Sequence, residues 1–132
     1  MDVEAAIRTR LLTDAMLPHY IGDRVSWIDR PRGEDYPAIT LQVISETRAQ
    51  HLKGFHPLQQ IIVQLDIWAR THLAGKVIKD AVLEALIPEA TIEGVKFLRA
   101  FATARDLSEK PPGEPTVFRP CIDFTFNYQF CS

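Results

Sequence analysis

The residue types that could bind a metal occur in two parts of the sequence. His51 and His56 are five positions apart in one polar segment, while Asp66 and His72 follow further along the chain. Imidazole and carboxylate groups are zinc ligands, but the sequence contains no HxH or HExxH spacing. This pattern indicates solvated or hydrogen-bonded side chains. We therefore expect neither a metal site nor a cofactor.

The sequence gives as little indication of thiol or hydroxyl chemistry as it gives of a metal site. Cys121 and Cys131 fall in one predicted strand, where ten residues span roughly 33 Å. A disulfide needs Cα atoms within about 7 Å, so both thiols are expected to be free. No Ser or Cys stands in a nucleophile-elbow context, and no enzymatic activity is expected.

A basic segment offers a different kind of contact. Residues 46–59 include Arg48, His51, Lys53 and His56 but only one acid, while the whole chain carries a net charge of -2. Loops of this length in a small domain are often functional. If the loop lined a lumen, Arg48 and Lys53 could contact passing DNA phosphates without reading sequence. An ordinary solvated loop is the alternative.

The segment 60–71 shows which elements would hold these side chains. Aliphatic residues alternate there with a mixed set, which is typical of a strand with one face against a core. The aliphatic set is Ile61, Val63, Leu65 and Ile67, and the mixed set is Ile62, Gln64, Asp66 and Trp68. Thr71 then caps a predicted helix whose apolar residues recur at helical spacing to Leu86.

The other elements complete a single domain over residues 1–132. We predict a helix at about 3–15, a short extended piece at 24–29, and strands at 38–45, 95–105 and 117–130. Loops are predicted at 46–59 and 106–116. The order α-β-β-α-β-β favours an α+β two-layer sandwich, with a four-stranded, mainly antiparallel sheet and two helices on one face.

The second face of that sheet is unusually apolar for a surface. Burying one large apolar side chain is worth about 1.5–3 kcal/mol, so exposed groups of them often mark partner surfaces. Asp66, flanked by Gln64 and Trp68, would suit a partner's Arg or backbone amides. The alternatives are an ordinary surface Asp, and a face covered by segment 24–29 or by the C-terminus. The interface candidates are Gln64, Asp66, Trp68, Phe97, Arg99 and Phe101.

In the order of its segments, the chain resembles the tail-terminator or tail-completion proteins of long-tailed bacteriophages and phage-derived particles such as gene transfer agents. The likeness is best from about Ile7 to Leu86 and rests on order and spacing together. The matching segments, after an N-terminal helix, are IGDRVSW (21–27), DYPAITLQVISET (35–47), LKG (52–54), VQLDIWA (63–69) and an Ala-rich helix.

The resemblance implies a structural role in the virion. Such proteins form a ring, commonly a hexamer, that caps the tail tube, ends its polymerisation and offers a surface for head-tail joining. The implied partners are further copies of the chain, the major tail-tube protein and a head-completion or connector protein. The loop residues Arg48, His51, Lys53 and His56 would reach a neighbouring subunit, the tube or the lumen.

Two other functions fit the same sequence. One is a head-closure or connector protein of the same particle, and the other is a small α+β binding or regulatory domain acting as a dimer. No apolar run approaches the ~20 residues that span a bilayer, and the N-terminus opens with acidic residues instead of a basic signal region. We therefore expect assembly in the host cytoplasm and location at the head-proximal end of the tail.

Overall fold

The structure is a computed structural model that describes residues 2–32, 35–47, 58–110, 112–113 and 115–131. The predicted loop contacts Arg48, His51, Lys53 and His56 lie outside these residues. Three helices are present among them: α1 (Val3–Leu12), α2 (Leu17–Ile21) and α3 (His72–Leu86). The strands are β1 (Val25–Trp27), β2 (Ala38–Thr47), β3 (Gln59–Trp68), β4 (Ala90–Ile92), β5 (Val95–Phe97), β6 (Phe101–Glu109) and β7 (Val117–Phe130).

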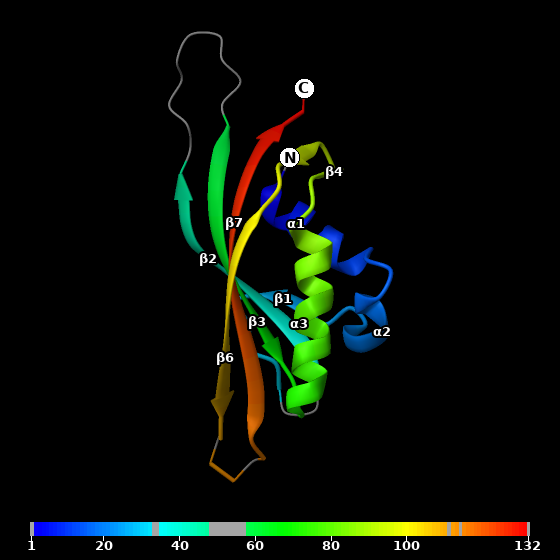
Figure 1. The fold of residues 1–132 in the computed structure, drawn as a ribbon, viewed down its shortest axis with the longest axis vertical. Helices are drawn as coiled ribbons and strands as arrows, with labels where there is room; N and C mark the ends of the chain where they lie inside the picture. Colours follow the sequence, from blue (N-terminus) through cyan, green and yellow to red (C-terminus); the bar gives the residue numbers. More distant parts are fainter. Residues whose placement is uncertain (1, 33–34, 48–57, 111, 114, 132) are drawn as a thin grey trace.

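The predicted four-stranded two-layer α+β sandwich is wrong. The chain is mostly β, with seven strands in one curled, mixed sheet of order β1-β2-β3-β7-β5-β4, in which β6 also pairs with β7. The sheet forms a half-barrel, and the helices lie along one side of it (Figure 1). Strands of three residues, such as β1 and β4, are too short to show a period of two in the sequence.

The long strands follow their predicted alternation. Ile61, Val63, Leu65 and Ile67 of β3 are fully buried, and their antiparallel neighbours on β7 include the equally buried Phe124. Thr71 caps α3 as predicted, since its side chain accepts a hydrogen bond of 3.1 Å from the backbone N–H of Ala74.

A register shift divides the predicted third strand at residues 98–100. Phe97 pairs with Tyr128, whereas Phe101, four positions later, pairs with Thr125, only three positions earlier on β7. This β5–β6 bulge contains one residue more than the facing segment of β7. The side chains after it therefore point to the other face than they would in an unbroken strand. Phe97 is therefore fully buried, and the prediction that it faces outward beside Phe101 is wrong.

Two long antiparallel strand pairs reach opposite ends of the molecule along its longest axis. The connected ends of β2 and β3 lie at one end and those of β6 and β7 at the other, with α3 running beside the sheet between them (Figure 1). The first residues of the predicted connector 106–116 belong to β6, which continues to Glu109.

The helices are held close to the sheet. Gly75 of α3 lies so near β7 that a Cβ atom there would be 3.0 Å from Cγ of Pro120. At the other end of α3, the buried Arg10 of α1 donates hydrogen bonds of 2.9 and 2.8 Å to the carbonyls of Ala85 and Pro88. The Ala85 carbonyl belongs to the last turn of α3 and Pro88 follows that helix directly, so Arg10 ties α1 to the C-terminal end of α3.

Candidate functional site

The sheet face turned away from α1 and α3, here called the outer face, carries most of the predicted interface residues. Gln64, Asp66 and Trp68 alternate on it along β3. Across the sheet, Asp66 pairs with Cys121 and Gln64 with Asp123, so β7 contributes the neighbouring polar positions. The outer face has two different parts, a polar and aromatic one around Trp68 and one around the exposed Phe101.

Trp68 is packed by its own chain. Its side chain is only 5% exposed, and its indole N–H donates a hydrogen bond of 2.9 Å to the Thr40 hydroxyl. The Tyr36 ring stacks on it with centroids 6.5 Å apart, and the guanidinium carbons of Arg30 and Arg119 lie 4.9 and 5.4 Å from its ring centroid. Stacking, cation-π contacts and a hydrogen bond from the same chain therefore hold this indole in place.

Asp66 is also surrounded by groups of the same chain. Its carboxylate accepts a hydrogen bond of 3.2 Å from the side-chain amide of Gln64, and the Arg119 guanidinium lies 3.8 Å away. The Cys121 thiol, opposite on β7, is hydrogen-bonded to the same carboxylate. Asp66 thus organises a small internal network before any partner approaches.

This environment determines the acidity of Cys121. Burial, the hydrogen bond to Asp66 and the negative charge of that carboxylate raise the pKa of the thiol from 9.0 to about 12. The thiolate is the reactive form of cysteine, so Cys121 is chemically inert at neutral pH. Cys131, which is half-buried at the end of β7, is the second free thiol.

A thiol reagent at pH 8 is expected to label Cys131 and leave Cys121 unmodified until the protein unfolds. Mass spectrometry before and after denaturation measures this, and Cys131→Ser should leave no reactive thiol in the native protein. Unfolding returns the Cys121 pKa towards 9.0. The protonated Cys121 thiol therefore makes its full contribution to the free energy of unfolding below that pH. That contribution is lost as the pH rises towards 12. Two labelled thiols without denaturant would contradict the expectation.

A second part of the outer face is a row of two apolar and two hydroxyl side chains across four strands, made by Phe101, Thr125, Ile62 and Ser45 and here called the outer row. Pairing brings Phe101 next to Thr125, Thr125 next to Ile62, and Ile62 next to Ser45. Phe101 is 69% exposed. A phenylalanine this open on a sheet is typical of a contact surface.

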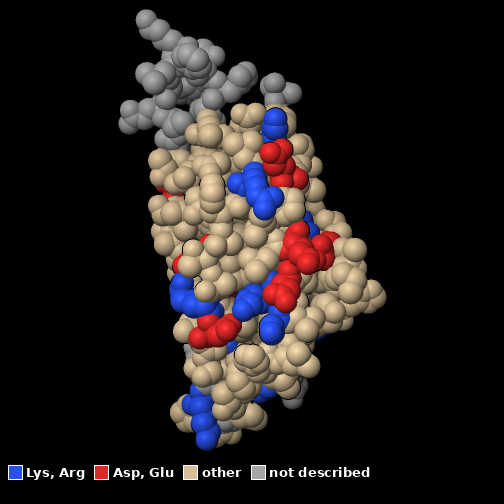
Figure 2. Space-filling view, in the orientation of Figure 1, with Lys and Arg blue, Asp and Glu red and all other residues tan. Residues whose placement is uncertain are grey.

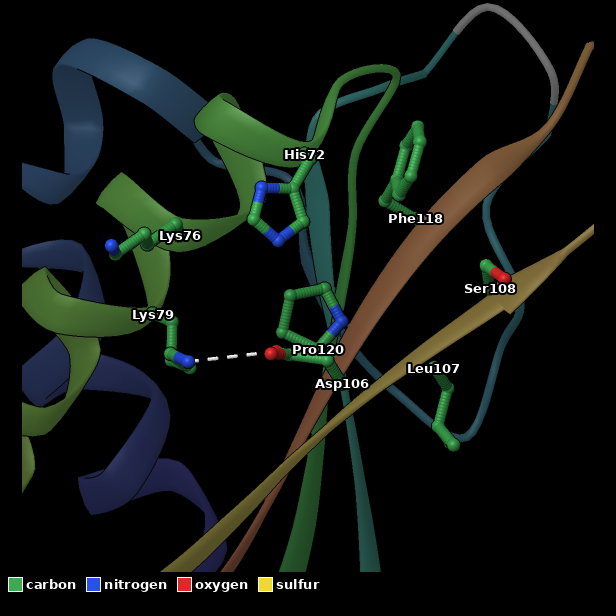
Figure 3. A pocket seen from close by; sticks show the side chains of 8 residues that line it. All are labelled: His72, Lys76, Lys79, Asp106, Leu107, Ser108, Phe118 and Pro120. Carbon is green, nitrogen blue, oxygen red and sulfur yellow. Dashed lines mark hydrogen bonds and ion pairs between the residues drawn. The ribbon is translucent and has the colours of Figure 1, made fainter.

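A hollow that the sequence did not predict lies between α3 and the β6–β7 hairpin. Its volume is about 440 Å³. His72, Lys76 and Lys79 approach it from α3 (Figure 3), and the Lys79 ammonium lies 3.5 Å from the Asp106 carboxylate. The remaining lining residues are Leu107 and Ser108 of β6 and Phe118 and Pro120 of β7. Because it forms between segments distant in sequence, no local pattern indicates it.

Charge is distributed in small groups over this side of the molecule. Figure 2 shows acidic and basic side chains interspersed on the described part of the visible face. Among the described residues, no three His, Cys, Asp or Glu side chains are grouped so that they could hold a metal ion. None of the helices in the described part of the chain is long and apolar enough to cross a bilayer.

Comparison with solved structures gives the same fold in other proteins. A chain from the virion of a native gene transfer agent particle superposes with a TM-score of 0.69 at 15% identity, covering 96% of this chain and 94% of that chain. A second solved chain has a TM-score of 0.56 at 14% identity, covering 98% of this chain and 95% of that one. No curated protein has a significantly similar sequence.

Comparison with protein families identifies the chain itself. The model of the family described as "Tail completion protein gp17" matches residues 5–125, which is nearly the whole chain. The predicted relationship to tail-completion proteins is confirmed, and so is the predicted location in the virion tail. The chain belongs to the tail completion protein gp17 family and is a structural protein of a phage-type tail.

Proposed function

We propose that the protein forms a ring at the head-proximal end of the tail tube, where it ends tube polymerisation and offers the surface for head-tail joining. The observation that carries this proposal is the position of the two hairpins. The paired ends of β2 and β3, at Thr47 and Gln60, and of β6 and β7, at Glu109 and Val117, lie at opposite ends of one sheet (Figure 1). One subunit can therefore contact two different neighbours along the tail.

The mechanism follows from the geometry of polymerisation. Tube subunits add head to tail, through a heterologous contact that repeats until the growing end no longer matches the next subunit. A ring that fits the tube on one side and differs on the other removes this template. In a hexamer, which is the ring size we expect, six weak contacts act together, so no single contact needs to be tight.

Contact between neighbouring subunits is assigned to the outer row. Phe101 and Ile62 lie on either side of Thr125, and Phe101 is largely exposed. Asp66 and Trp68 already have partners within the chain, so they support this surface from one side. Arg99 is exposed within the β5–β6 bulge. As interface residues, Gln64, Asp66, Trp68, Arg99 and Phe101 stay predictions.

Deletion of the gene from its producing strain, followed by negative-stain electron microscopy of the lysate, tests the proposal. Filled heads without tails, beside loose tails of uncontrolled length, are the expected result, because nothing would stop the tube. Tails of normal length that fail to join heads would contradict tube termination and assign the protein to joining alone. Intact particles in normal numbers would contradict both roles.

A further inference from the structure

The outer edge of β6 is an open sheet edge. β6 pairs with β7 through nine residue pairs, and among the described residues no strand pairs with its other side. In Figure 1, β6 forms the border of the sheet in the lower half of the molecule. An edge strand of this length presents a row of backbone N–H and C=O groups to any extended chain that can reach it.

The usual protection of such an edge is weak here. Proteins commonly guard edges with prolines, bulges or free charges. No proline occurs within β6, and its two central charges are held by the same chain. Arg105 forms an ion pair of 2.6 Å with Asp123, and Asp106 lies 3.5 Å from the Lys79 ammonium. Each of these side chains would have to break its ion pair before it could point towards an approaching strand.

Two hollows lie along one side of α3, one shared with β6 and β7 and one beside the β5–β6 bulge, and they are here called together the groove. The α3 residues His72, Lys76, Lys79, Leu83 and Ile87 recur every three or four positions, which puts them on one side of the helix. The first three line the hollow of about 440 Å³, and the last two line a second hollow of about 250 Å³ that Arg99 also borders. Opposite them, β6 contributes the small Ala102 and Ala104 before the lining residues Asp106, Leu107 and Ser108.

The two ends of the groove differ in chemistry. Near the β6–β7 hairpin, Lys79 points to the carboxylate of Asp106, the one acidic residue of the lining, while Lys76 extends away from it (Figure 3). Near the bulge, Leu83, Ile87 and Pro88 make the lining predominantly apolar. An added strand directs alternate side chains to one face, so the groove would receive an acidic side chain at one end and apolar ones at the other.

We propose that β6 binds an extended segment of a partner protein as an added strand, with its acidic residues over Lys76 and Lys79 and its apolar residues over Leu83 and Ile87. Backbone hydrogen bonds to β6 would supply affinity, and the groove would select the sequence. A single subunit can make this contact, so the inference goes beyond ring formation and does not depend on it.

The test uses the full chain and two synthetic peptides, ETETVTITV and KTKTVTITV, which differ only in charge and are written for antiparallel pairing with β6. Amide hydrogen exchange followed by NMR reports on the edge. The acidic peptide is expected to slow exchange in β6, with an affinity about fivefold higher than that of the basic peptide. Lys76→Glu should remove this preference, whereas Lys96→Glu, at an exposed position on β5, should preserve it.

Three results would overturn the proposal. The first is unchanged exchange in β6 at saturating concentrations of either peptide. The second is equal affinity for both peptides in the unmodified protein. The third is protection of β6 that rises with protein concentration alone, because the edge would then pair with a second copy of the chain. All are read on the isolated protein, so they are distinguishable from a failure of the ring proposal in the deletion strain.

Discussion

Replacing Phe101 with aspartate should yield a folded protein that no longer supports assembly of joined particles. The side chain is 69% exposed, so its loss removes little packing. We expect the free energy of unfolding to fall by less than about 1 kcal/mol, reflecting the low strand propensity of Asp. A carboxylate in the outer row would have to be desolvated at a subunit contact, and repetition around a ring multiplies that cost.

Complementation of the deletion strain measures this effect as particle yield, and urea unfolding measures stability. Leu73→Asp is the matched control, because Leu73 is also 69% exposed but lies on α3, away from the outer row. The control should give normal particles. Normal yield from Phe101→Asp would show that the outer row is not a contact surface, and a fully unfolded variant would show that Phe101 is needed for the fold.

Unlike Phe101→Asp, replacing Trp68 with alanine should destabilise the isolated chain. The indole is 5% exposed and is packed against Tyr36, Arg30 and Arg119. Truncation of a buried Trp costs about 3–5 kcal/mol, a large share of the 5–15 kcal/mol that stabilises a typical domain. The loss should appear as a lower midpoint in urea unfolding monitored by far-UV circular dichroism.

Trp68→Phe separates the packing of the ring from its hydrogen bond. The phenyl ring keeps the stacking position but cannot donate to the Thr40 hydroxyl, so we expect a loss of about 1 kcal/mol. A Trp68→Ala variant as stable as the unmodified protein would mean that the aromatic and arginine contacts around Trp68 contribute nothing. Trp68 would then again be a surface residue that is free to contact a partner.

Long regular elements could be predicted from the sequence, because their periods repeat often enough to be recognised. The alternation on β3 and β7 and the cap at Thr71 are examples. The short strand β4 could not, since three residues carry no usable period, and β1 was predicted only as a short extended piece at 24–29 outside the sheet. For the same reason, the sheet was predicted with too few strands and without its curl.

The site was predictable in part. Alternation correctly put Asp66 and Trp68 on the same sheet face, but it could not reveal that Tyr36 and Arg30, from a distant segment, cover the indole. The order of segments carried the family relationship, which the match over residues 5–125 confirms. The groove beside α3 depends on contacts between α3, β6 and β7 and has no local signature.

The β5–β6 bulge has a consequence for how this family varies. Phe97 and Phe101 are on opposite faces only because the β5–β6 segment contains one residue more than the β7 segment with which it pairs. Loss of a single codon within residues 98–100 would remove the bulge, and Phe101, then three positions after Phe97, would keep its pairing with Thr125 and its outward direction. A gap of one residue here therefore leaves surface and core in place, whereas an alignment that puts the same gap elsewhere along β6 will compare residues with unrelated roles.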